Sequence, residues 1–109
     1  MLDAGIVSRC RAKLVEVARK HARITYGDLA KHLGVANQSV GPYLDAIYKD
    51  EIAAGRPDLT LVVVYSETGY GRFNSRGRQP KSKKVDPDNS VDVQTYEAEL
   101  RKVYAHPWH

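Results

Sequence analysis

The stretch from Arg72 to Lys84 constrains the fold more than any other part of this chain, because it is rich in cations and lacks both acidic residues and apolar periodicity. A segment without an apolar face gains nothing from burial, so the sequence predicts a flexible cationic loop, about 72–86, beside a small folded body. The cations of the stretch are Arg72, Arg76, Arg78, Lys81, Lys83 and Lys84. Cations that approach phosphates release condensed counterions, which drives much of nucleic-acid affinity. The loop therefore indicates a polyanionic partner, with a solvated surface or a disordered linker as the alternative interpretation.

The length of 109 residues and the hydrophobic content of 42% suit a single domain, residues 1–109, with one modest core. The net charge of +4 understates the basic loop, because residues 86–99 are acidic. The single cysteine, Cys10, excludes an intramolecular disulfide and fits a reducing compartment. The sequence has no apolar run that spans a bilayer and no secretory signal. We therefore expect a cytoplasmic protein without a membrane partner.

Apolar spacing predicts a first helix over residues 2–22. Its apolar stripe consists of Val7, Cys10, Leu14 and Val17, which recur at intervals of three and four. On this stripe Cys10 is expected to be a small core residue rather than a nucleophile.

Two further helices are expected to follow. The second is predicted over residues 26–33, with Thr25 as its cap and Gly34 as its stop. The third is predicted over residues 37–54, where Pro42 leaves two possibilities open, since proline suits a first helical turn but disrupts a helix interior. Either the helix begins beside the proline, or it begins near residue 37 and is distorted at the proline, which is the interpretation we favour.

The second half of the chain predicts strands and one more helix. Residues 59–65 are short, apolar and β-branched, as is typical of a strand. A glycine-containing turn over residues 66–71 would return the chain into a second strand at residues 71–73. After a turn and cap at residues 86–90, a last amphipathic helix is predicted over about 90–104.

This order of elements predicts the fold class. Three helices followed by a strand, a turn and a returning strand have the layout of a winged helix, in which the second helix of a helix-turn-helix pair enters the major groove. We therefore expect an α+β protein: a winged helix-turn-helix with three N-terminal helices, a β-hairpin wing and a C-terminal helix.

The start of the third helix offers Asn37, Gln38 and Ser39 as base contacts. Asn and Gln can bridge the adenine edge, and Ser can meet a base or a phosphate; the alternative is that these residues cap the helix. On the wing, Tyr70 can stack on a base or pack on a sugar, or it can close the core instead. The predicted nucleic-acid-binding residues are Asn37, Gln38, Ser39, Tyr70, Arg72, Arg76, Arg78, Lys81, Lys83 and Lys84.

Residues 24–34, Ile-Thr-Tyr-Gly-Asp-Leu-Ala-Lys-His-Leu-Gly, resemble the beginning of the helix-turn-helix in winged-helix proteins. These proteins include the DNA-binding part of alkylguanine-DNA alkyltransferases and alkyltransferase-like proteins. Alkyl transfer itself is not expected, because those enzymes carry a Pro-Cys-His-Arg active-site motif that this chain lacks.

A longer resemblance, from about Ile24 to the end, is to small and mostly uncharacterised bacterial and phage proteins. The corresponding segments are residues 55–59, 63–69 and 103–108, and the basic insertion after Phe73 is where this chain departs most from the pattern. The resemblance implies a winged-helix module, sometimes encoded near restriction or mobile-element genes. It does not imply a defined biochemical role.

Enzyme chemistry has little support in the sequence. The four histidines, His21, His32, His106 and His109, do not form a metal-ligand spacing with carboxylates or with Cys10. A glycine-rich phosphate loop and a nucleophile elbow are both absent. We therefore expect no catalytic residue, no metal and no cofactor.

The leading hypothesis is a non-enzymatic protein that binds double-stranded DNA, as a regulator or accessory factor of a phage, mobile-element or DNA-processing system. The alternatives are a protein-interaction winged-helix module, such as an inhibitor or adaptor of a bacterial defence system or a homodimer, and a small nuclease subunit.

Overall fold

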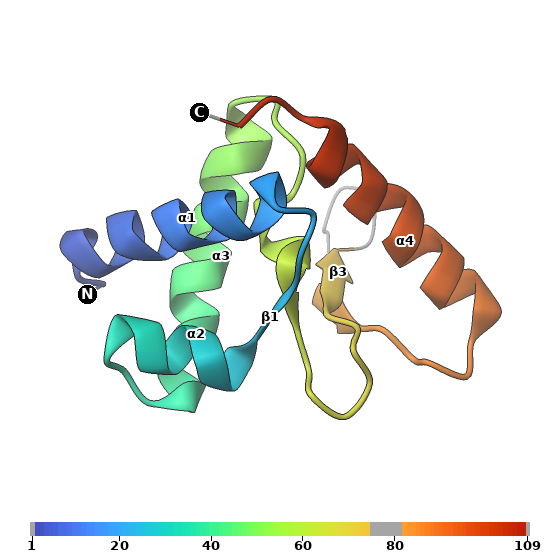
Figure 1. Ribbon diagram of the computed structural model, residues 1–109, viewed down its shortest axis with the longest axis horizontal. Coiled ribbons are helices and arrows are strands. Elements are labelled where there is room, and N and C mark those ends of the chain that lie inside the picture. The colour runs from blue at the N-terminus through green and yellow to red at the C-terminus, as the bar shows by residue number, and fades with distance from the viewer. Residues whose placement is uncertain (1, 75–81, 109) are drawn as a thin grey trace.

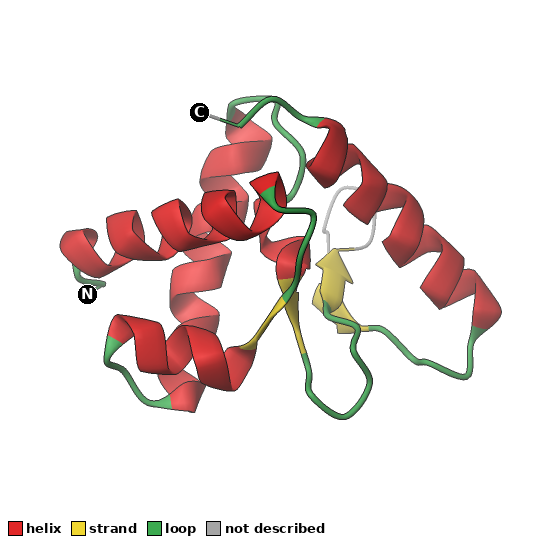
Figure 2. Cartoon of the chain, viewed as in Figure 1, coloured by secondary structure: helices red, strands yellow, loops and turns green. Residues whose placement is uncertain are grey.

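The computed structural model describes residues 2–74 and 82–108, which form an α+β protein in which helices predominate. Helices lie on both sides of short strands near the middle of the molecule (Figures 1 and 2). The elements, with η for 3-10 turns, are α1 (Ala4–Arg19), β1 (Ile24–Thr25), α2 (Tyr26–Leu33), η1 (Asn37–Ser39), α3 (Val40–Ala53), η2 (Leu59–Val62), β2 (Val63–Val64), β3 (Arg72–Asn74), β4 (Ser82–Lys84) and α4 (Ser90–Ala105).

Helix α1 lies within the predicted range but begins later, because Asp3 caps it. The Asp3 carboxylate accepts hydrogen bonds from the amides of Gly5 and Ile6. The predicted apolar stripe faces the core, where Cys10 and Leu14 are fully buried. Burial raises the pKa of the Cys10 thiol to about 11, so the thiol stays protonated near neutral pH. The prediction that Cys10 is a core residue is confirmed.

Helix α2 has the predicted bounds and the predicted caps. The Thr25 hydroxyl accepts a hydrogen bond from the Asp28 amide. Gly34 ends the helix with a φ of 71°, in the left-handed region that favours glycine.

The third helix differs from the interpretation that we favoured. Residues 37–39 form the separate 3-10 turn η1, and α3 begins at Val40. Pro42 therefore lies in the first turn of α3, where its missing N–H would have no helical acceptor. The alternative in which the helix begins beside the proline describes the structure better.

The predicted hairpin between residues 59–65 and residues 71–73 is wrong. Within residues 59–65, only Val63 and Val64 form a strand, β2. This strand pairs in parallel with β1, with Ile24 opposite Val63 and Thr25 opposite Val64. A continuous buried apolar run without alternation is typical of a segment covered on both faces, as in parallel pairing.

The basic stretch also differs from the predicted loop, because it contains two strands. Strand β3 pairs with β4 in the antiparallel direction. The chain still reverses just before β3: the Tyr65 amide donates to the Tyr70 carbonyl over 2.9 Å, and Gly69 has a φ of 72°.

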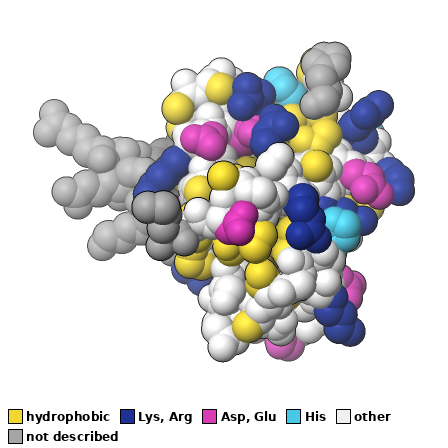
Figure 3. All heavy atoms as spheres, turned by 90° about the vertical axis from the view of Figure 1, so that its left-hand side faces the viewer, with side chains coloured by type: hydrophobic (Ala, Val, Ile, Leu, Met, Phe, Trp, Pro, Cys, Tyr) yellow, Lys and Arg dark blue, Asp and Glu magenta, His cyan; other side chains and the backbone are white. Residues whose placement is uncertain are grey.

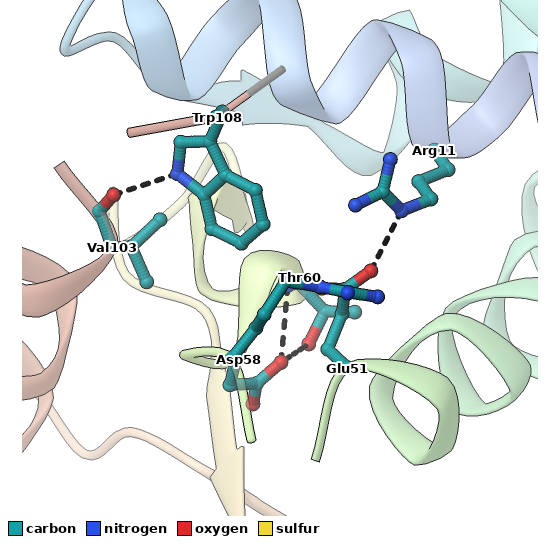
Figure 4. Close-up of polar contacts among 7 residues, drawn as sticks. Arg11, Glu51, Asp58, Thr60, Val103 and Trp108 are labelled. Carbon is teal, nitrogen blue, oxygen red and sulfur yellow. Dashed lines mark hydrogen bonds and ion pairs between the residues drawn. The ribbon is translucent and has the colours of Figure 1, made fainter. Parts of the chain in front are cut away.

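Helix α4 covers the core from the other side and ends within one residue of the predicted position. Tyr96 is fully buried, and its hydroxyl donates a hydrogen bond to the Leu61 carbonyl. After α4, Trp108 folds back onto the core and its indole Nε1 donates to the Val103 carbonyl over 2.7 Å (Figure 4). The C-terminal tail is thereby fixed to the body.

A buried carboxylate links three parts of the body. Glu51 of α3 is fully buried, and its two oxygens accept hydrogen bonds from Arg11 of α1 at 2.7 Å and from Arg56 at 2.5 Å (Figure 4). The Arg11 guanidinium also lies 6.0 Å from the centre of the Trp108 ring. Glu51 therefore links α3, the helix that follows η1, to α1 and to Arg56.

Candidate nucleic-acid interface

Turn η1, the start of α3 and strand β3 meet at an open cleft of about 610 Å³. The cleft is lined by Thr25, Tyr26, Gly27, Asn37, Gln38, Gly41, Tyr65, Ser66, Glu67 and Arg72. It therefore brings together two of the predicted base contacts, Asn37 and Gln38, and one of the predicted phosphate contacts, Arg72.

Two tyrosines that line the cleft, Tyr26 and Tyr65, were not among the predicted site residues. The rings of Tyr26 and Tyr65 stack with centroids 4.7 Å apart and planes 30° from parallel. Their proximity follows from the β1–β2 register, since each tyrosine directly follows the paired residues Thr25 and Val64. The sequence carries no local signal for this proximity, because it depends on the parallel pairing of β1 with β2.

Two cations of the basic stretch converge on Tyr65. The β3–β4 register places Arg72 directly opposite Lys84. The Arg72 Nη1 donates to the Tyr65 hydroxyl over 3.4 Å, and the Lys84 Nζ lies 4.3 Å from the centre of the Tyr65 ring. Contacts of this cation–π kind are worth about 0.5–1 kcal/mol at exposed sites. The hairpin therefore presents two positive charges beside the aromatic pair.

The hydroxyl of Tyr26 is a neutral hydrogen-bond donor in this setting. Burial raises the pKa of Tyr26 well above its ordinary value, and the neighbouring Tyr65 raises it further, although Arg72 acts in the opposite direction. The hydroxyl consequently keeps its proton near neutral pH, and part of the rise in pKa comes from a hydrogen bond with Tyr65, so a phosphate oxygen would have to share or replace that partner.

The capping alternative is not observed for η1, and Asn37 and Gln38 line the cleft, whereas Ser39 is not part of its lining. Asn37 and Gln38 are exposed, and Ser39 is half-buried. Ser39 is the N-cap residue of α3, yet its hydroxyl makes no capping hydrogen bond, and η1 has no side-chain cap either.

The remaining predicted site residues are not brought together in the same way. Tyr70 does not line the cleft; its half-buried ring packs edge-on against Tyr96, with centroids 5.8 Å apart, which fits the alternative core role. Lys83 belongs to β4, but its side chain lies outside the described part of the chain. Three more predicted contacts lie outside the described residues: Arg76, Arg78 and Lys81.

One face of the molecule carries side chains of both charges. On the face shown in Figure 3, which is the left-hand side of Figure 1, Lys and Arg side chains are interspersed with acidic and hydrophobic ones. At the cleft itself, Glu67 adds one acidic side chain to the lining. The paired positions of Arg72 and Lys84 are therefore a local feature of the β3–β4 hairpin.

Within residues 2–74 and 82–108, no group of three or more His, Cys, Asp or Glu side chains is arranged to hold a metal ion. No helix in the same ranges combines the length and the apolar character needed to cross a membrane. No family model, curated protein or solved structure matches this chain.

Proposed function

We propose that this chain is a non-enzymatic, winged-helix-like protein that binds double-stranded DNA, as a regulator or accessory factor of a DNA-processing system. In this proposal η1 and the start of α3 face the major groove, and the β3–β4 hairpin serves as the wing. The proposal rests on the cleft, because the cleft brings the polar side chains of Asn37 and Gln38 together with the guanidinium of Arg72.

The observation that carries the proposal is the pair formed by Arg72 and Lys84. The β3–β4 register places these two positive charges directly opposite one another, so an anion beside this part of the hairpin would interact with both. Both cations also contact Tyr65. A phosphate group would neutralise both charges and would receive the strong hydrogen bonds that guanidinium and ammonium groups donate.

The proposed roles follow from the side-chain chemistry. Arg72, Lys84 and the Tyr26 hydroxyl would hold phosphates and so position the duplex without reading its sequence. Asn37 and Gln38 would meet base edges, and Ser39 would serve a base or a phosphate. Arg76, Arg78 and Lys81 stand between the two strands in the sequence, Lys83 belongs to β4, and all four would add phosphate contacts.

The first test removes the cation pair. The double variant Arg72→Gln/Lys84→Gln is expected to bind every duplex more weakly, by about tenfold or more near 0.1 M salt, because two phosphate contacts are lost. The slope of log affinity against log salt should become shallower by about 1.8, at about 0.9 per phosphate contact. Fluorescence anisotropy with a labelled duplex across a series of KCl concentrations measures both quantities.

A matched control tests whether the position of the two positive charges matters, or only the net charge of the protein. Lys20→Gln/Lys102→Gln removes two positive charges from exposed side chains that are paired with Glu16 and Glu99 on α1 and α4. The control is expected to keep the wild-type salt slope. If the two double variants lose the same affinity, or if the Arg72/Lys84 variant binds like wild type, the assignment of the cleft is wrong.

A further inference from the structure

A second hollow, of about 240 Å³, opens beside the cleft, and we call it the side pocket. Its lining consists of Tyr26, Gly41, Leu44, Asp45, Tyr48, Thr60 and Arg72. Tyr26, Gly41 and Arg72 line both hollows, so a polymer lying in the cleft would pass directly over the side pocket. The other four lining residues belong to the side pocket alone.

The size and the walls of the side pocket suit one flat ring system. Pockets for drug-sized ligands measure about 300–1,000 Å³, so this volume is too small for two nucleotides and suits a single base. Tyr26 and Tyr48 offer aromatic surface, and Leu44 adds an apolar side chain. Stacking on such aromatic side chains tolerates any base, because every base has a π-face.

The two charged side chains of the side pocket favour a ligand with a particular arrangement of polar groups. Asp45 contributes a carboxylate, and Arg72 contributes a guanidinium, within the same small lining. A carboxylate accepts hydrogen bonds from an exocyclic amine of a base, and a guanidinium pairs with a phosphate. A ligand with an amine at one end and a phosphate at the other satisfies both, and a nucleotide has this pattern.

The Tyr48 hydroxyl completes the polar lining. Burial raises the pKa of Tyr48, and the carboxylates of Asp58 and Asp45 raise it further, so the hydroxyl keeps its proton. A neutral hydroxyl can both donate to and accept from a base edge. Asp45 itself is mostly exposed and pairs with Lys49 on the surface, at 2.9 Å, so its carboxylate can exchange partners at small cost.

We propose that the side pocket holds a single unpaired nucleotide of the bound DNA, with its base against Tyr26 and Tyr48, its exocyclic amine toward Asp45 and its phosphate on Arg72. This inference rests on the proposed function, because the cleft must first hold the adjoining duplex. The preferred partner is then a duplex with an unpaired nucleotide at an end or a gap.

The test compares a blunt duplex with the same duplex carrying one unpaired terminal 2-aminopurine nucleotide. The second duplex is expected to bind about fivefold or more tightly, since stacking of one base on aromatic side chains is worth at least that much. The 2-aminopurine fluorescence should change in parallel with binding. Tyr48→Leu and Asp45→Asn are expected to abolish or reduce the preference and to leave the affinity for the blunt duplex unchanged.

Controls distinguish this inference from the proposed function. Asp45→Asn alters an exposed side chain, so it serves even where Tyr48→Leu lowers stability. Gln38→Ala alters the cleft alone, and it should weaken both duplexes while keeping the preference. Equal binding of the two duplexes by the wild type overturns the side-pocket assignment but leaves DNA binding intact. Binding of neither duplex overturns both proposals, and free 2-aminopurine nucleotide binding as tightly as the overhang overturns the assignment to DNA.

Discussion

Gly71→Ala is expected to lower the free energy of unfolding by about 2–4 kcal/mol, because it forces a methyl group into the backbone of a buried strand. The added Cβ would lie 2.3 Å from the Val63 carbonyl oxygen and 3.5 Å from the Tyr96 hydroxyl. A carbonyl of β2 cannot rotate away as a flexible side chain can, so the two chain segments must separate. Gly71 itself does not have a positive φ, so the expected effect comes from the steric clash of the added methyl group alone.

The same substitution is expected to weaken DNA binding. Gly71 precedes Arg72, and its carbonyl accepts a hydrogen bond from the Val85 amide over 3.0 Å, next to the β3–β4 pair. A shift of this segment therefore displaces the cation that lines the cleft. Urea unfolding followed by the fluorescence of the buried Trp108 measures the stability loss, and the melting temperature should fall by about 10 °C or more.

Gly41→Ala is the matched control for this prediction. An added Cβ at Gly41 meets nothing within 4 Å, and the residue lies in helix α3. Alanine in a helix is more stable than glycine by about 0.5–1 kcal/mol, so this variant should be at least as stable as wild type. A Gly71→Ala protein that unfolds at the wild-type urea concentration would show that Gly71 does not lie as close to the Val63 carbonyl as described.

The helices were predictable because their signals are local. Thr25 and Gly34 mark the ends of α2 through a hydrogen bond and a backbone conformation that involve only a few neighbouring residues, whereas the cap at Asp3 was not predicted. The strands were not predictable in the same way, because pairing depends on distant segments. Strand β1 is two residues long and shows no strand pattern of its own, so its parallel pairing with Val63 and Val64 could not be read from the sequence.

The candidate site was likewise predictable where its signals are local and unpredictable where it depends on distant segments. The helix-turn-helix layout predicted Asn37 and Gln38 at the exposed start of the third helix, where the structure has the turn η1, and composition identified Arg72 and Lys84 as members of the basic stretch. What the sequence could not supply was the contact of both cations with Tyr65, because that contact depends on the β3–β4 register. The side pocket was equally invisible, since its lining comes from four separate parts of the chain.

The second large effect is expected at the buried carboxylate of Glu51. Glu51→Gln keeps the size of the side chain but removes the charge that receives hydrogen bonds from Arg11 and Arg56. We expect a loss of about 1–3 kcal/mol in the free energy of unfolding at pH 7. The loss stays below the largest values for broken buried pairs, about 3–5 kcal/mol, because both arginine side chains are about one-third exposed, at 34% and 36%, and can be rehydrated.

The lowered pKa of Glu51 predicts how the stability loss in Glu51→Gln changes with pH. Burial alone would raise the pKa of Glu51, but the hydrogen bonds from Arg56 and Arg11 outweigh it and hold the pKa below its ordinary value of 4.5. A carboxylate with a lowered pKa stabilises the folded state above its ordinary pKa, and this stabilisation is lost as the pH falls through the folded-state value. The difference between wild type and Glu51→Gln should therefore be largest near pH 7 and shrink steadily below about pH 4.5.

Glu16→Gln is the control that separates the effect of losing a buried carboxylate from the effect of losing an exposed one. The pKa of Glu16 is also lowered, first by a hydrogen bond from Lys20 and then by the charge of Lys13, but this carboxylate lies on the surface. Water and salt screen exposed pairs, so Glu16→Gln should unfold at the wild-type temperature at both pH 7 and pH 3. If Glu51→Gln behaved like this surface variant at pH 7, or kept its full deficit at pH 3, the ionised carboxylate of Glu51 would not be what fixes α3 to α1.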